Sequence, residues 1–209
     1  INPKLVYCSI TGYGATGPDA KRRAYDLTTQ AMSGLMSVTG HPGNPPTKAG
    51  TPMGDTISAG FALSAILGAL FHRERTGEGQ HIDISMTDIL FSLIFDEALD
   101  IYEDLGMPFQ QGNRIMRFSP FNAYPTQDGW LVIGIGHDAM WRALCVLIGR
   151  KDLGDHADWG RMDWRVENND QVDAVVAEWT KTRTTEDAVS LLEADGIVAS
   201  PVSYTHLTL

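Results

Sequence analysis

The spacing of apolar residues divides the first half of the chain into strands and helices. The runs Lys4–Ile10 and "HIDIS" (His81–Ser85) predict β-strands, the second because apolar and polar residues alternate. Apolar residues recur every three or four positions in three longer runs, which predict helices over Tyr25–Val38, Thr56–Arg75 and Met86–Leu105. Small residues in the middle run permit close packing of that helix against its neighbours.

The pattern changes after residue 105, and a smaller α+β unit is predicted there. Gly106–Pro120 has the composition of a linker. The stretch "NAYPTQDGWLVIGIG" predicts a hairpin that turns at Asp128-Gly129 and returns as a strand over Trp130–Gly136. Helices are predicted at His137–Ile148, Asn168–Thr182 and Thr184–Ala194. Gly196 is placed to end the last helix, and "IVAS" begins a strand.

Both ends of the chain read as cut. "INPKLVYCSI" begins almost directly in a strand, and the closing "VSYTHLTL" has the residue pattern of neither a helix nor a strand. It resembles the translation of a sequencing adaptor, so we interpret residues 203–209 as a non-native tail; the alternative is an ordinary polar tail. The predicted organisation is 1–105 as part of a large domain, 106–120 as linker and 121–202 as a small domain of an internal fragment.

Composition narrows the class of function. The 209 residues are 43% hydrophobic and 20% charged, which is typical of a globular protein. A net charge of −10 argues against nucleic-acid and membrane-surface partners, because both favour a basic face. Apolar stretches such as "FALSAILGALF" are too short to span a bilayer. Cys8 and Cys145 lie in no metal-binding motif and indicate reduced thiols of a cytoplasmic protein.

The most conspicuous motif is "GYGATG", Gly12 to Gly17, directly after the first predicted strand. Its spacing suggests a dinucleotide site and hence an NAD-binding oxidoreductase. Pro18 follows the third glycine at once, where a helix should begin, and no second strand ending in an acid follows. We therefore interpret the glycines as a turn beside a ligand or a packed backbone. The pairs His81/Asp83 and His137/Asp138 lack a second cluster, so no metal site is predicted.

Two other stretches carry charge that chemistry could use. "DAKRRAYD" places three consecutive cations beside the glycine loop, and the residues leave open a solvated face or a phosphate contact. In "TPMGDTIS", Asp55 precedes a helical run. It could cap that helix or act as a nucleophile, since Gly54 would admit a ligand to the backbone and the N–H groups of Thr56 and Ile57 would favour a carboxylate.

Taken together, the chain resembles a family III CoA-transferase. The blocks that carry the resemblance are spread over Asn2 to Val202: "NPKLVYCSITGYGATGP", "YDLTTQAMSGLMSVTG", "PPTKAGTPMGD", "AILGALFHRERTGEGQ", "HIDISMTD", "YPTQDGWLVIGIG" and "LLEADGIVASPV". The resemblance implies an α/β fold, with a Rossmann-like large domain, present here in part, and a small α+β domain. It also implies an interlocked homodimer, with acyl-CoA and a carboxylic acid as substrates and no cofactor.

The resemblance also implies roles for particular residues. Asp55 aligns with the catalytic aspartate, whose carboxylate forms a mixed anhydride with the acyl group and then an aspartyl-CoA thioester. The resemblance places CoA contacts at Arg23, Ala24, Tyr25, Asp26 and Met86. The glycine-run loop of formyl-CoA transferases is absent, so specificity for formate or oxalate is not predicted.

Two other readings remain beside the transferase. α-Methylacyl-CoA racemase has the same fold, but carries a histidine where this chain has Tyr25, and a phenol is a poor base near neutral pH. A fragment that only binds CoA weakly, or misfolds, is the non-enzymatic alternative. The sequence does not identify the acyl donor or acceptor.

Overall fold

The computed structural model describes residues 2–95 and 99–203. The chain forms two compact units, Ile1–Gly112 and Asn113–Leu209, which are described separately. The division falls within the predicted linker, and the domain boundaries given above stay predictions. Apart from Ser203, the tail interpreted as non-native lies outside the described residues.

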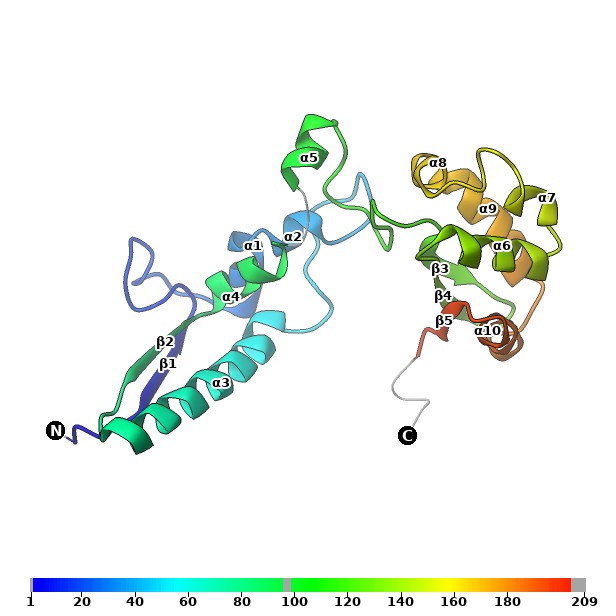
Figure 1. The fold of residues 1–209 in the computed structure, drawn as a ribbon. Helices are drawn as coiled ribbons and strands as arrows, with labels where there is room; N and C mark the ends of the chain where they lie inside the picture. The colour runs from blue at the N-terminus through cyan, green and yellow to red at the C-terminus, as the bar shows by residue number, and fades with distance from the viewer. Residues whose placement is uncertain (1, 96–98, 204–209) are drawn as a thin grey trace. The chain divides into compact units, whose positions relative to one another are not determined.

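The first unit is built on two parallel strands, β1 (Tyr7–Thr11) and β2 (His81–Ser85), with Tyr7 opposite His81 and Thr11 opposite Ser85. Helices lie in the crossover between the two strands and after β2 (Figure 1), three in the crossover and two after β2 among the described residues. The helices are α1 (Asp26–Met32), α2 (Leu35–Val38), α3 (Met53–Thr76), α4 (Met86–Leu93) and α5 (Leu99–Asp104). Both predicted strands are confirmed.

Two predicted helices are interrupted. The run Tyr25–Val38 forms α1 and α2 because Gly34 adopts a left-handed conformation, with φ of 87°, that ends helical hydrogen bonding. The run Met86–Leu105 forms α4, which ends at Leu93, and α5, which begins at Leu99. The part of that prediction over residues 96–98 lies outside the described residues.

Helix α3 is the long helix of this unit and lies along both strands (Figure 1). It also packs against α4 and α1. Its buried residues are small ones, Gly54, Ser58, Ala62 and Ala69, so it approaches its neighbours closely. By length and composition it is the one helix of the described residues that could cross a membrane, a test that core helices also pass.

The second unit pairs a three-stranded antiparallel sheet with five helices. The strands lie in the order β3 (Phe121–Pro125), β4 (Trp130–Gly134) and β5 (Val198–Pro201). The helices are α6 (Asp138–Leu147), α7 (Lys151–Gly154), α8 (Met162–Glu167), α9 (Asn169–Thr180) and α10 (Thr185–Ala194). The predicted hairpin and its turn are confirmed, since Thr126 N–H donates to the Gly129 carbonyl. Helices α7 and α8 were not predicted.

The two cysteines are free thiols in different surroundings. Cys8 is half-buried on β1, whereas Cys145 lies in the core of the second unit with Trp141 and Leu144. Burial raises the pKa of the Cys145 thiol to about 12, so the thiol is protonated at neutral pH. Cys145 is therefore a packing residue.

Candidate active site

Asp55 lies within the first turn of α3 and does not cap the helix. The N-cap residue is Pro52, followed by Met53 and Gly54, so Asp55 is the third helical residue and its side chain is exposed. The interpretation of Asp55 as an N-cap is wrong for this reason. Thr56 N–H, expected to favour a carboxylate at the helix start, instead donates to the Pro52 carbonyl at 3.0 Å.

A carboxylate from another helix takes the capping role. Asp26, the first residue of α1, accepts a hydrogen bond on Oδ1 from Gly54 N–H at 2.7 Å. A carboxylate so placed also interacts favourably with the positive end of the α3 dipole. The Asp55 side chain is therefore not needed as a cap. In addition, the backbone N–H of Asp55 makes no hydrogen bond within the described residues.

Gly54 is required by packing and not by an approaching ligand. A Cβ at this position would lie 2.9 Å from Thr29 Oγ1, 3.1 Å from Asp26 Oδ1 and 3.3 Å from Leu90 Cδ1. The space beside its backbone is therefore filled by α1 and α4, which corrects the expectation that Gly54 admits a ligand. Because Gly54 has no side chain, the starts of α1 and α3 can approach each other closely.

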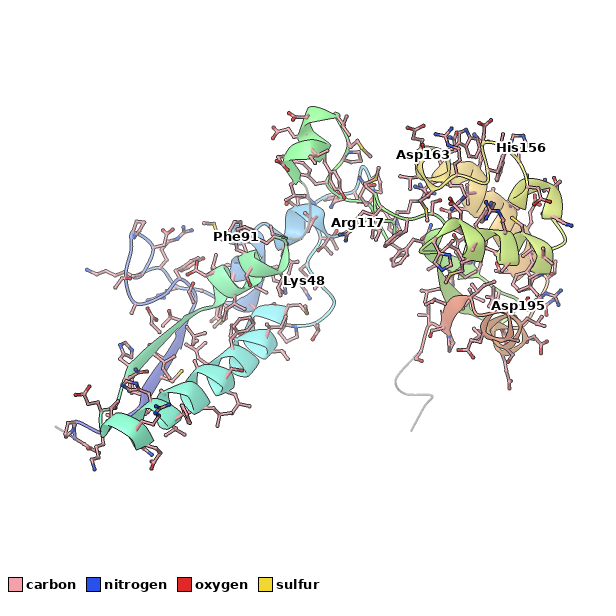
Figure 2. All side chains as sticks on the ribbon, viewed as in Figure 1. Lys48, Phe91, Arg117, His156, Asp163 and Asp195 are labelled. Carbon is pink, nitrogen blue, oxygen red and sulfur yellow. The ribbon has the colours of Figure 1, made fainter. Side chains whose placement is uncertain are left out.

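The residues before α3 are held by a buried glutamine. Gln30 on α1 is 0% exposed; its Oε1 accepts from Ala49 N–H at 2.9 Å and its Nε2 donates to the Thr51 carbonyl at 3.3 Å. Nε2 also donates to Asp26 Oδ2 at 2.7 Å. Lys48, labelled in Figure 2, precedes this stretch, and its Nζ donates to the Ala49 carbonyl. Sequence patterns gave no sign of these contacts, because they join segments about twenty residues apart.

The predicted contact Tyr25 lies beside Asp26, the residue that caps α3. A 2.7 Å hydrogen bond joins Asp26 to Gly54. Tyr25 precedes Asp26 and Asp55 follows Gly54 in the sequence, so Tyr25 and Asp55 lie on either side of this bond. The Tyr25 side chain is 83% exposed, and its position at the N-cap of α1 is fixed by Thr28 Oγ1, which accepts from Tyr25 N–H. Arg23 is exposed and forms no ion pair among residues 2–95 and 99–203.

The other predicted contacts lie around this point. Ala24 is half-buried against the glycine loop, where a Cβ on Gly12 would come within 2.2 Å of the Ala24 Cβ. Met86, half-buried, is the first residue of α4 and precedes Leu90 by one helical turn on the same face. Since Leu90 packs under Gly54, Met86 extends that face of α4 beyond the contact.

The glycine loop lacks the helix of a dinucleotide site. Gly14 and Gly17 have φ of 81° and 94°, and the next helix begins only at Asp26. The loop is held by side chains: Asp83 Oδ2 accepts from Ala15 N–H at 2.7 Å, and Thr87 donates to the Gly12 carbonyl. The prediction that these glycines form a turn is confirmed.

The remaining charged candidates have structural partners. Arg22 pairs with Asp19 at 3.1 Å and lies over the Tyr13 ring, and the hydrogen bond that the guanidinium donates to Asp19 raises the pKa of Arg22. His137 caps α6 by accepting from Met140 N–H. No group of three or more metal-binding side chains occurs in the part of the chain that the structure describes.

Comparison with known proteins identifies the family. The model of "CoA-transferase family III" matches residues 1–208. The chain belongs to CoA-transferase family III. Among curated relatives of this family III chain, succinate–glutarate CoA-transferase of Agrobacterium fabrum is 35% identical over 97% of the chain and 51% of its own length. Succinyl-CoA:mesaconate CoA-transferase of Haloarcula marismortui is 37% identical over 98% of the chain and 52% of its own.

The solved structures agree with this assignment. A CAIB/BAIF family protein from Brucella suis superposes with a TM-score of 0.83 and 34% identity, over 98% of this chain and 54% of that protein. The expected fold class, a family III α/β fold with a small α+β unit, is confirmed. The family III chain spans about half the length of the curated relatives it matches.

Proposed function

We propose that the complete protein is a CoA-transferase that moves CoA from an acyl-CoA to a carboxylic acid, with Asp55 as the nucleophile. The observation that carries the proposal is that Asp55 is exposed on the first turn of α3, free of the capping role that Asp26 fills. Family membership supports CoA transfer as the class of reaction. The names of the curated relatives support an acyl-CoA and a carboxylic acid as the substrates.

The proposed reaction proceeds by covalent catalysis in balanced steps. The Asp55 carboxylate attacks the acyl carbonyl, the C–S bond breaks, and a mixed anhydride and CoA thiolate form. The thiolate attacks the Asp55 carbonyl carbon, releasing the donor acid and leaving an aspartyl-CoA thioester. The acceptor carboxylate then attacks this thioester and expels the thiolate, which attacks the acceptor's carbonyl and frees Asp55.

The surrounding residues have proposed roles in this cycle. Arg23 contacts a CoA phosphate, while Ala24, Tyr25, Asp26 and Met86 form or support the CoA site. The unpaired Asp55 N–H is a donor available to a developing oxyanion. We take succinyl-CoA and dicarboxylic acids as first substrates, following the names of two relatives. An interlocked homodimer in the cytoplasm, without metal, belongs to the same proposal.

The test uses the complete protein, an acyl-CoA panel headed by succinyl-CoA, and mass spectrometry of the peptide that contains Asp55. We expect a CoA adduct on Asp55 and a loss of transfer activity of at least about 10³-fold in Asp55→Ala. Asp55 is exposed, so the variant should keep its unfolding midpoint. An unmodified Asp55 together with α-proton exchange in deuterated water would overturn the transferase in favour of a racemase.

A further inference from the structure

We propose that Asp26 and Gln30 are positioning residues for Asp55, acting through the backbone of residues 49–54 and not through contact with substrate. The inference rests on the proposed function, since it assumes that Asp55 is the nucleophile. It assigns Asp26 and Gln30 of α1 to the reaction, although the hydrogen bonds of their side chains run to each other and to the backbone of residues 49, 51 and 54.

Four hydrogen bonds carry the argument. Asp26 Oδ1 accepts from Gly54 N–H at 2.7 Å, and Gln30 accepts from Ala49 N–H and donates to the Thr51 carbonyl. The fourth, from Gln30 Nε2 to Asp26 Oδ2 at 2.7 Å, ties the two side chains together. The pair therefore holds the residues that lead into α3 at Ala49, Thr51 and Gly54, and we call this set of contacts the grip. Asp55 directly follows Gly54.

The grip is closed to solvent at Gln30, while Asp26 is half-buried. Gln30 is 0% exposed and Thr29, between the two residues, is also 0% exposed. Thr29 Oγ1 donates to the Asp26 carbonyl at 2.9 Å, which fixes the first turn of α1 from which Asp26 reaches out. Buried, mutually bonded groups of this kind hold one geometry, because any alternative would leave a buried polar group without a partner.

The reaction needs such a device at this place. The stretch before α3 is a Pro- and Gly-containing loop, and Asp55 itself makes no side-chain hydrogen bond within the described residues. Its carboxylate is thus located by its backbone alone. A displacement of about 1 Å of a reacting group costs roughly 100-fold in rate. Loosening the grip should therefore lower kcat and leave KM for the acyl-CoA unchanged.

The experiment compares variants of the complete protein in succinyl-CoA transfer assays. We expect Asp26→Ala and Gln30→Ala each to lower kcat about 10- to 100-fold, with KM changed less than twofold. Because the two residues act as one unit, the kcat of the double variant should be no lower than that of the less active single variant. The matched control is Ser33→Ala: Ser33 is buried at the end of α1 and donates to the Gln30 carbonyl, but among the described residues its side chain forms no hydrogen bond with residues 49–54. It should keep kcat within twofold.

A swapped pair protects the test from a simple loss of folding. Asp26→Asn places an amide N–H opposite Gln30 Nε2 and should lower kcat, whereas Asp26→Asn combined with Gln30→Glu restores a donor–acceptor match at the same net charge and should recover part of it. Hydrogen exchange of the peptide covering 49–55 should be faster in Asp26→Ala than in wild type, whether or not transfer is observed.

The outcomes separate the two proposals. A raised KM with unchanged kcat in Asp26→Ala would overturn positioning and make Asp26 a CoA contact. Unchanged kcat with unchanged exchange would overturn the grip itself. Full activity in Asp55→Ala would instead overturn the proposed function, and the positioning role with it, even if exchange shows that Asp26 and Gln30 hold the segment.

Discussion

At the scale of single residues, Gly54 and Asp26 determine the position of Asp55, the proposed nucleophile. The hydrogen bond from Gly54 N–H to Asp26 is possible because Gly54 lacks a Cβ, and it relieves Asp55 of capping. Three residues that are separate in the sequence therefore form one local arrangement: Gly54 allows the close approach, the Asp26 carboxylate caps α3, and the Asp55 carboxylate is left for its proposed chemistry. An exposed acid with no structural duty is the kind of group that catalysis can use.

The glycines of α3 give a test of this arrangement on the 209-residue chain. Gly54→Ala should destabilise it by about 1 kcal/mol, because overpacking costs about 1–3 kcal/mol against a gain of about 1 kcal/mol in helix propensity. In Gly60→Ala, the matched control, a Cβ meets nothing within 4 Å, so a gain of about 0.5–1 kcal/mol is expected. Urea unfolding measures both. Equal effects of the two substitutions would show that the start of α3 is not tightly packed.

At the scale of elements, a turn of the second unit is tied to a helix. Asp128 Oδ1 accepts from the backbone N–H and the Oγ–H of Thr185, each at 2.8 Å, so the β3–β4 hairpin is fastened to the start of α10. These bonds lower the pKa of the Asp128 carboxyl, the backbone bond contributing most. The ionised carboxylate is the form that holds the two elements together.

The sign of the resulting pH effect follows from the lowered pKa. Stability from Asp128 is present above its ordinary pKa of 3.8 and is lost as pH falls through the lower folded value. We expect Asp128→Asn to lower the urea midpoint at neutral pH and to converge with wild type in acid. Asp195, labelled in Figure 2 and free of side-chain hydrogen bonds among the described residues, is the control; Asp195→Asn should not lower the midpoint. A gap for Asp128→Asn that persists in acid would contradict the prediction.

Elements with a local signature were predictable, and those without one were not. Alternating residues and the Asp128-Gly129 turn define β3 and β4 through neighbours in the sequence. Helices α7 and α8 are short and have no sustained period, so they left no pattern. Asp55 was singled out from its local sequence and given its proposed role by the resemblance. The hydrogen bond between Gly54 and Asp26 was not predicted, because it spans 28 residues and leaves no local pattern.

At the scale of the whole molecule, α3 is apolar on two faces. One face packs on β1, β2 and α4; the other carries Leu63, Leu67 and Phe71, all exposed, on a stripe shared with the small residues Gly60, Ser64 and Gly68. A helix that is apolar all round usually has a partner on each side, and small residues on the stripe would let a partner helix come close.

The outer stripe of α3 should make the 209-residue chain self-associate. Leu67 is 57% exposed within a contiguous apolar patch, so burying it between copies removes apolar surface from water. We expect sedimentation velocity to show concentration-dependent association, weakened at least tenfold by Leu63→Lys combined with Leu67→Lys. Val146 on α6 is 61% exposed but lies in the other unit, so Val146→Lys serves as the control and should leave association unchanged. If the Leu63/Leu67 variant associates as wild type does, copies meet through another surface and the stripe is not the contact.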